Sequence, residues 1–143
     1  MKKGVDYTGI AVTFMCHDGK GNLLLQKRGQ NARDERGAWG PGGGGIEFTE
    51  TAENAVRREV KEEYNLDALE IAFLGYRDVL RTMDGVSTHW LLLDFKVLVD
   101  PSEAKIGEPD MIEEIRWVTL STIPEPMHSQ FPRYLELHKQ KLV

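Results

Sequence analysis

The sequence predicts a small α+β protein in which strand-like and helix-like segments are interleaved along one chain. The strand-like segments are apolar and rich in β-branched residues, whereas the helix-like segments repeat their apolar residues with a period near 3.6. We expect strands at residues 9–16, 23–28, 69–80, 87–99 and 111–120, and helices at residues 52–64 and 130–141. A chain of 143 residues without internal repeats or a linker is expected to form one domain over residues 1–143.

The first two strands are expected to pair as a hairpin, because residues 17–22 between them are typical turn formers. The second strand ends at Arg28, and a polar loop follows it at residues 30–37. At the end of a strand, Arg28 can either be solvated or contact a substrate anion, and the sequence favours neither. For Arg33 and Arg36 in the loop, solvation is the default reading.

A run of four glycines, Gly42–Gly45, precedes the first helix and is expected to form a loop. Glycine has no Cβ, so the backbone here can approach a ligand closely. Thr51 is suited to cap the helix N-terminus, because its hydroxyl can accept a backbone hydrogen bond. Asn65 suits the left-handed position that ends many helices.

The carboxylates of this helix are the main chemical signal in the sequence. At 100° per residue, Glu59, Glu62 and Glu63 share one stripe with the small apolar residues Ala55 and Val56. Basic residues occupy the opposite side, so this stripe is not the solvated face. Carboxylates directed inward must be paired or hold a metal, and clustered oxygen ligands suit Mg²⁺ or Mn²⁺.

The two long strands that follow the helix are expected to form a second hairpin. Asp84 and Gly85 between them are a typical hairpin turn pair. In the strand at residues 87–99, Trp90 and Phe95 lie on opposite faces. Trp90 could stack on a nucleotide base, although a tryptophan in a strand belongs more often to the core.

Composition argues against several classes of function. A net charge of −5 does not suit a surface that follows a nucleic acid polymer. The single Cys16 cannot form an internal disulfide, which is consistent with a reducing, cytoplasmic location. The chain shows no signal peptide pattern, and no apolar run reaches the ~18 residues that a membrane-spanning helix needs. The histidines have no metal-ligand spacing.

The segment from Gly44 to Leu66 resembles the Nudix box, G-x5-E-x7-R-E-U-x-E-E-x-G-U, in which U is a bulky aliphatic residue. The chain carries eight of the nine specified residues: Gly44, Glu50, Arg58, Glu59, Val60, Glu62, Glu63 and Leu66. The ninth position holds Asn65 where the family has glycine, and asparagine tolerates the left-handed conformation.

This resemblance implies an α/β/α sandwich with a mixed sheet between helices. It implies hydrolysis of a pyrophosphate bond in a nucleoside diphosphate linked to a further group X, with Mg²⁺ or Mn²⁺ as cofactor. The implied roles fall on named residues: Glu59, Glu62, Glu63 and a backbone carbonyl near Gly43 as metal ligands, Arg58 with Glu50 to orient them, and Arg28 as a contact to substrate phosphate.

The substrate and the remaining site residues stay open. The short chain looks most like the MutT-type branch, which converts nucleoside triphosphates to monophosphates and pyrophosphate. ADP-ribose or another nucleotide sugar is the alternative substrate, and a non-catalytic nucleotide-binding module is a third reading. Trp90 and Gln130 are the candidates for base recognition. A homodimer is a common state for such enzymes.

One further carboxylate outside the box commonly joins the site in this family, as a metal ligand or a base. The acidic residues around the start of the last strand are four candidates, for which a solvated position is slightly favoured: Glu108, Asp110, Glu113 and Glu114.

Overall fold

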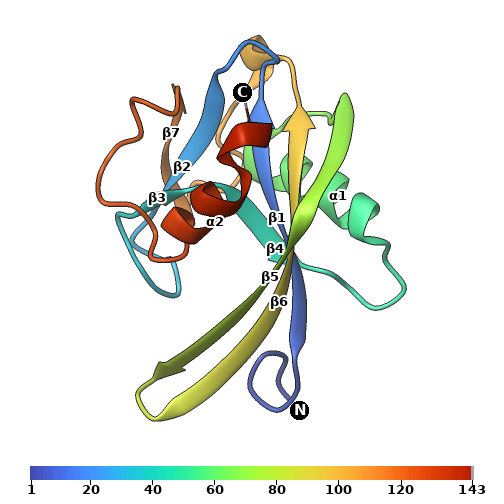
Figure 1. The fold of residues 1–143 in the computed structure, drawn as a ribbon, viewed down its shortest axis with the longest axis vertical. Helices are drawn as coiled ribbons and strands as arrows, with labels where there is room; N and C mark the ends of the chain where they lie inside the picture. Colours follow the sequence, from blue (N-terminus) through green and yellow to red (C-terminus); the bar gives the residue numbers. More distant parts are fainter. Residues whose placement is uncertain (143) are drawn as a thin grey trace.

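The protein, described over residues 1–142 by a computed structural model, consists of one seven-stranded mixed sheet with two α-helices (Figure 1). The strands are β1 (Gly9–His17), β2 (Leu23–Arg28), β3 (Trp39–Gly40), β4 (Gly42–Gly45), β5 (Glu70–Met83), β6 (Val86–Leu98) and β7 (Ile112–Val118). The helices are α1 (Ala52–Tyr64) and α2 (Phe131–His138), with single 3₁₀ turns at Pro101–Glu103 and Lys139–Lys141. The expected fold class, a mixed sheet between helices, is confirmed.

The sheet branches at β1. One edge of β1 pairs in parallel with β6 along its whole length, from Gly9 to His17. The other edge is divided, because Ala11–Phe14 pair with β4 whereas only Cys16 and His17 pair with β2. The predicted hairpin of the first two strands therefore exists but is short, and β2 continues into pairs with β3 and β7.

The glycine run is the main departure from the predicted elements. Gly42–Gly45 form strand β4 instead of a loop, and none of the four glycines has a positive φ. Because glycine has no side chain, β4 leaves room for the side chains that pack against it. A Cβ on Gly42 would lie 2.4 Å from the Phe14 ring, and a Cβ on Gly44 would lie 2.2 Å from Oε1 of Glu59. The strand can therefore lie directly against α1, as only a strand without side chains could.

Helix α1 begins and ends where its caps were predicted. The Thr51 side chain accepts a hydrogen bond of 3.1 Å from the backbone N–H of Asn54. Asn65 is left-handed at φ 56°, and its N–H donates to the carbonyl of Lys61. The position of the helix in the chain is therefore set by local signals at both ends.

Each helix covers its own hydrophobic core. Val56, Val60 and Tyr64 of α1 pack on one side of the sheet with Phe14 and Val97. On the other side, α2 contributes to a separate cluster of buried residues: Met15, Leu23, Leu25, Trp39, Leu74, Val118, Phe131, Tyr134 and Leu142. Neither α1 nor α2 has the length and apolar composition of a membrane span. Helix α2 is shorter than predicted, because after His138 the chain tightens into a 3₁₀ turn.

The β5–β6 hairpin extends well beyond the rest of the sheet (Figure 1). Its turn residues Asp84 and Gly85 both have positive φ, at 53° and 77°, which confirms the predicted hairpin turn. In β5, Arg77, Val79 and Arg81 alternate with exposed residues and therefore share one face.

The packing of β4 against β1 gives a stability prediction. Replacing Gly42 with alanine places a Cβ against the Phe14 ring inside the core, so we expect a loss of about 1–3 kcal/mol in the free energy of unfolding. Gly45→Ala is the matched control, because its Cβ would have no neighbour within 4 Å among residues 1–142, and it should change stability by less than about 0.5 kcal/mol. Urea unfolding measures both, and equal stabilities would contradict this packing.

Candidate functional site

Glu63 is a buried carboxyl at the centre of the site. Helix α1 directs it toward the sheet, where only 4% of the residue is exposed. The side chain of Gln26 on β2 donates to Oε1 of Glu63 over 2.7 Å and lies 2.9 Å from the Tyr64 hydroxyl. Among residues 1–142, no arginine or lysine forms an ion pair with Glu63. Its hydrogen-bond partner is therefore the uncharged Gln26.

Glu59 lies beside Glu63 against the glycine strand. The carboxylate of Glu59 fills the space that a side chain at Gly44 would take, and Oε1 of Glu63 lies 3.0 Å from the position of a Cβ on Gly42. The sequence thus correctly predicts inward carboxylates at Glu59 and Glu63.

For Glu62 the predicted inward direction is wrong. Its side chain is 45% exposed at the rim, because Val60 and Tyr64 occupy the buried face of the helix in its place. The buried face of α1 is therefore centred closer to Val60 than the helical projection of the sequence predicted.

The cluster carries excess negative charge. Burial raises the pKa of the Glu63 carboxyl well above its usual range, and the neighbouring Glu59 and Glu108 raise it further. The pKa of Glu108 is also raised, by partial burial and by Glu59 and Glu62. Four oxygen-donor side chains with so little compensating charge fit a divalent cation such as Mg²⁺, which takes carboxylate ligands.

Among the four acidic candidates outside the helix, Glu108 is the one beside this cluster. Its loop docks on the last turn of α1, where the N–H of Gly107 donates to the Glu63 carbonyl over 2.9 Å. Two of the other candidates are held elsewhere, since Glu113 pairs with Lys27 and Glu114 pairs with Arg116. Asp110 borders a separate hollow.

Arg58 links the helix to the loop that precedes it. Its Nε and Nη2 contact the two carboxylate oxygens of Glu50 at 2.7 and 2.8 Å, and its Nη1 contacts Glu59 at 2.8 Å. Nη2 also donates to the carbonyl of Gly45 over 3.1 Å, and Nη1 lies 3.4 Å from Glu62. The guanidinium lowers the pKa of Glu50 to about 2. Arg58 and Glu50 are thus placed where they could hold Glu59 in position.

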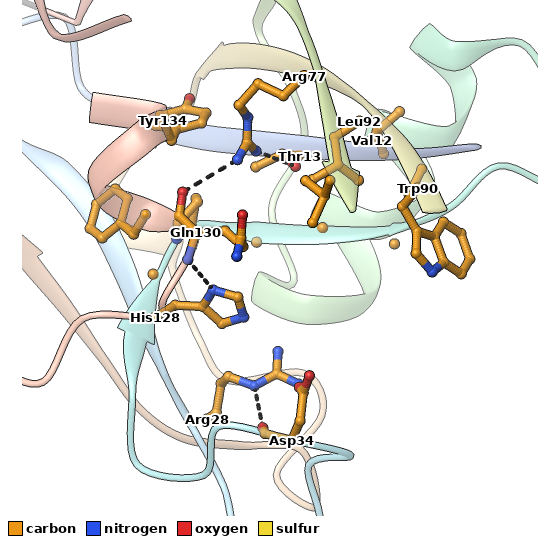
Figure 2. A pocket seen from close by; sticks show the side chains of 18 of the residues that line it. Val12, Thr13, Arg28, Asp34, Arg77, Trp90, Leu92, His128, Gln130 and Tyr134 are labelled. Carbon is orange, nitrogen blue, oxygen red and sulfur yellow. Dashed lines mark hydrogen bonds and ion pairs between the residues drawn. The ribbon is translucent and has the colours of Figure 1, made fainter. Parts of the chain in front are cut away.

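A cavity of about 410 Å³ lies beside the glycine strand, and Figure 2 shows side chains that line it. Its walls come from the glycine strand, the β5–β6 hairpin and the segment that leads into α2. Four residues predicted for the site line it: Arg28, Gly43, Trp90 and Gln130. The box carboxylates do not line the cavity. Gln26, Gly42 and Gly44 do, and each of these three residues also lies against Glu59 or Glu63, so the glycine strand lies between the cavity and the cluster.

Arg28 lies at the rim of the cavity within a network of ion pairs. It contacts Asp34 of the following loop at 2.8 Å, and Arg81 of the hairpin contacts Asp34 at 3.2 Å and Glu35 at 3.3 Å. Nε2 of His128 lies 2.9 Å from Glu35. The network therefore ties together three segments that lie far apart in the sequence.

The same rim holds a second group of potential metal ligands, because atoms of Asp34, Glu35 and His128 lie within 4.8 Å of one another. The arginines already supply positive charge here. Burial lowers the pKa of His128, and Arg28 and Arg81 lower it further against the opposing effect of Glu35. Because Arg28 and Arg81 already pair with Asp34 and Glu35, this group fits a cation less well than the Glu59–Glu63 cluster.

Trp90 forms the far wall of the cavity. Its indole packs against the backbone of Gly4 and Gly9, where an added Cβ would clash with the ring. Trp90 is half-buried, and base stacking by it stays a prediction.

Sequence reasoning missed several lining residues, among them Thr13, Gln26, Arg77 and Arg81. For the arginines a signal existed. Arg77 and Arg81 alternate with the apolar Val79, so all three had to share a face of the strand. Nothing in the sequence indicated that this face borders a cavity.

Comparisons with known proteins agree with the geometry. The model of the NUDIX domain matches residues 7–137. A MutT NUDIX hydrolase from Burkholderia pseudomallei superposes with a TM-score of 0.80 at 27% identity, covering 91% of this chain and 97% of that one. The MutT protein from Methanosarcina mazei Go1 gives a TM-score of 0.76 at 25% identity, with 94% of each chain covered.

A third similar structure is the NUDIX domain of Shewanella oneidensis NrtR complexed with ADP ribose. It gives a TM-score of 0.74 at 18% identity, covering 100% of this chain and 91% of that one, a likeness in fold. A search of curated proteins gives no match. The family match spans most of the chain and includes the box helix, the glycine strand and the cavity-lining hairpin. The chain therefore belongs to the Nudix family and is a Nudix pyrophosphohydrolase.

Proposed function

We propose that this protein hydrolyses nucleoside triphosphates to monophosphates and pyrophosphate with Mg²⁺ or Mn²⁺, acting as a single catalytic domain. The observation that carries the proposal is the arrangement of opposite charges across the glycine strand. Excess carboxylates lie behind it at Glu59 and Glu63, and a cavity lined by four arginines lies in front.

The cavity suits a nucleotide in both charge and shape. Arg28, Arg33 and Arg81 offer positive charge toward phosphates, and Arg28 is two residues beyond Gln26, which contacts Glu63. Leu92 and Trp90 supply an apolar wall that a planar base can cover.

The carboxylates take the roles of ligand and base in this proposal. Glu59, Glu62 and Glu63, with the Gly43 carbonyl and Glu108, would hold the metal, and Arg58 with Glu50 would orient Glu59. A bound divalent cation neutralises charge on the diphosphate in the transition state. One carboxylate of the cluster takes the proton of the attacking water, a role worth about 10²- to 10⁴-fold in rate.

ADP-ribose is the second candidate substrate. The NUDIX domain of NrtR is complexed with ADP ribose, and its fold covers the whole of this chain. A screen of nucleoside triphosphates, damaged nucleotides and nucleotide sugars with Mg²⁺ decides between the two. Release of pyrophosphate from a triphosphate supports the proposal, whereas turnover of ADP-ribose alone, giving two monophosphates, overturns it in favour of the alternative.

Metal should stabilise the protein and be required for turnover. The carboxylates at Glu59, Glu63 and Glu108 repel one another, so we expect Mg²⁺ or Mn²⁺ to raise the melting temperature. At a metal concentration 100 times Kd, binding would add about 2.7 kcal/mol to the free energy of unfolding. Thermal unfolding with and without Mn²⁺ measures the shift, and Glu59→Gln should reduce it. Full activity in EDTA would refute the metal assignment.

Glu63→Gln should separate catalysis from stability. The amide oxygen can still accept from Gln26, and repulsion from Glu59 is removed, so the melting temperature should hold or rise. We expect kcat to fall at least about 100-fold. The control is Lys61→Gln on the exposed side of the helix, which should leave kcat near wild type. If Glu63→Gln unfolds the protein while Lys61→Gln does not, Glu63 is a structural residue instead.

Gly44→Ala tests whether the glycine strand positions Glu59. The new Cβ overlaps the Glu59 carboxylate, which ends a flexible side chain and can move at little cost in stability. We expect metal affinity to fall about 10- to 100-fold, measured by calorimetry with Mn²⁺. Gly45→Ala, whose Cβ meets no atom of the described residues within 4 Å, should bind Mn²⁺ as the wild type does. Equal Mn²⁺ affinities for the two variants would show that the strand does not set the carboxylate.

A further inference from the structure

We propose that Gln26 is a positioning residue, which holds the Glu63 carboxylate in place for a divalent cation without neutralising it. The inference rests on the proposed metal-dependent function and adds a residue that supports the same site. Three features of Gln26 favour this role: its place in the sheet, the contacts of its amide group and its lack of charge.

Gln26 lies where the sheet divides. Strand β2 pairs with β1 only at Leu23 and Leu24, whereas at Gln26 its partners are Gly40 of β3 and Ile115 of β7. Side chains alternate along a strand, so Gln26 shares the face of Leu24, which packs in the core beneath α1. The Gln26 side chain therefore points toward α1, and only 8% of the residue is exposed.

The amide nitrogen of Gln26 is held by two neighbouring residues of α1. Nε2 donates to Oε1 of Glu63 over 2.7 Å and to the hydroxyl of Tyr64 over 2.9 Å. An amide nitrogen has two N–H groups, so both have acceptors. Tyr64 is fully buried, and its ring lies edge-on to Phe14 with 6.1 Å between the ring centres. Core packing thus fixes the amide, and the amide fixes the carboxylate.

The two oxygens of Glu63 have different surroundings. Oε1 accepts from Gln26 and lies beside Gly42, where an added Cβ would be 3.0 Å away. Oε2 accepts no hydrogen bond from the residues that the structure describes. Carboxylate ligands of metals are commonly oriented by a hydrogen bond of this kind from a neighbouring group. Gln26 therefore occupies one oxygen of Glu63 and leaves the other for a cation.

An uncharged partner suits this position better than a lysine or an arginine would. A cationic side chain beside Glu63 would attract the carboxylate, but it would also repel a divalent ion on the same group. The amide of Gln26 holds the carboxylate and leaves its negative charge to attract the metal. Arg58 differs, because it reaches Glu59 from the edge of the cluster while its charge is shared with Glu50 at 2.7 and 2.8 Å.

The test is calorimetric titration of the metal-free protein with Mn²⁺. Gln26→Met keeps the length of the side chain but removes both hydrogen bonds, so we expect the Mn²⁺ affinity to fall about 10- to 100-fold. The matched control is Lys27→Met, because Lys27 lies on the opposite face of β2 and pairs with Glu113 at 3.2 Å. The control should bind Mn²⁺ as the wild type does. An unchanged affinity in Gln26→Met would overturn the proposal.

A double-mutant cycle shows whether Gln26 acts through Glu63. In protein that carries Glu63→Gln, the carboxylate is already absent, so adding Gln26→Met should change the Mn²⁺ affinity by less than about 2-fold. A role in folding alone would instead give the same loss in both backgrounds. That result would overturn the proposal.

Gln26→Lys tests the importance of the missing charge. Its ammonium group can pair with Glu63, so a donor is still present, but its charge opposes a bound cation. We expect a loss of Mn²⁺ affinity at least as large as that of Gln26→Met, in protein whose thermal unfolding shows that it is folded. Wild-type affinity in Gln26→Lys would overturn the role of the neutral amide.

The titrations separate this inference from the proposed reaction, because Mn²⁺ affinity is measured without substrate. Weaker Mn²⁺ binding by Gln26→Met, in a protein whose wild type hydrolyses no triphosphate, would overturn only the proposed reaction. Triphosphate hydrolysis by the wild type, with unchanged Mn²⁺ affinity in Gln26→Met, would overturn only the role of Gln26.

Discussion

The site depends on a carboxyl that the fold holds away from water. Glu63 is buried against a strand of glycines, with Glu59 and Glu108 near it and the amide of Gln26 as its hydrogen-bond donor. Such an arrangement is unfavourable unless another group compensates it. The close packing of these carboxylates is possible because the residues of β4 are glycines. At the edge of the cluster, Arg58 is held by its ion pair with Glu50.

The arginines that line the cavity have two kinds of environment. Arg77 at the inner end is neutralised by a buried aspartate and has a fixed direction. At the rim, Arg28 and Arg81 are partly exposed and share the carboxylates of a loop. A phosphate can displace those carboxylates more easily than it can displace Asp94. One cavity can thus bind a charged and an uncharged part of the same ligand at different ends.

Local signals in the sequence were enough to predict the helix caps at Thr51 and Asn65, the hairpin turn at Asp84 and the box that identifies the family. The features that failed depend on contacts between distant segments. The glycine run could not be recognised as a strand, because its partner in β1 is about 30 residues away along the chain. Glu62 was misplaced because helical projection alone cannot show which flank of a stripe meets the sheet.

The central claim is that the carboxylates behind the glycine strand, and not those at the cavity rim, hold the metal. Anomalous diffraction at the manganese edge from crystals grown with Mn²⁺ tests this most directly. The account predicts manganese on Glu59, Glu62 and Glu63 beside the glycine strand. Manganese bound instead at Asp34, Glu35 and His128, with none on the helix, would contradict it.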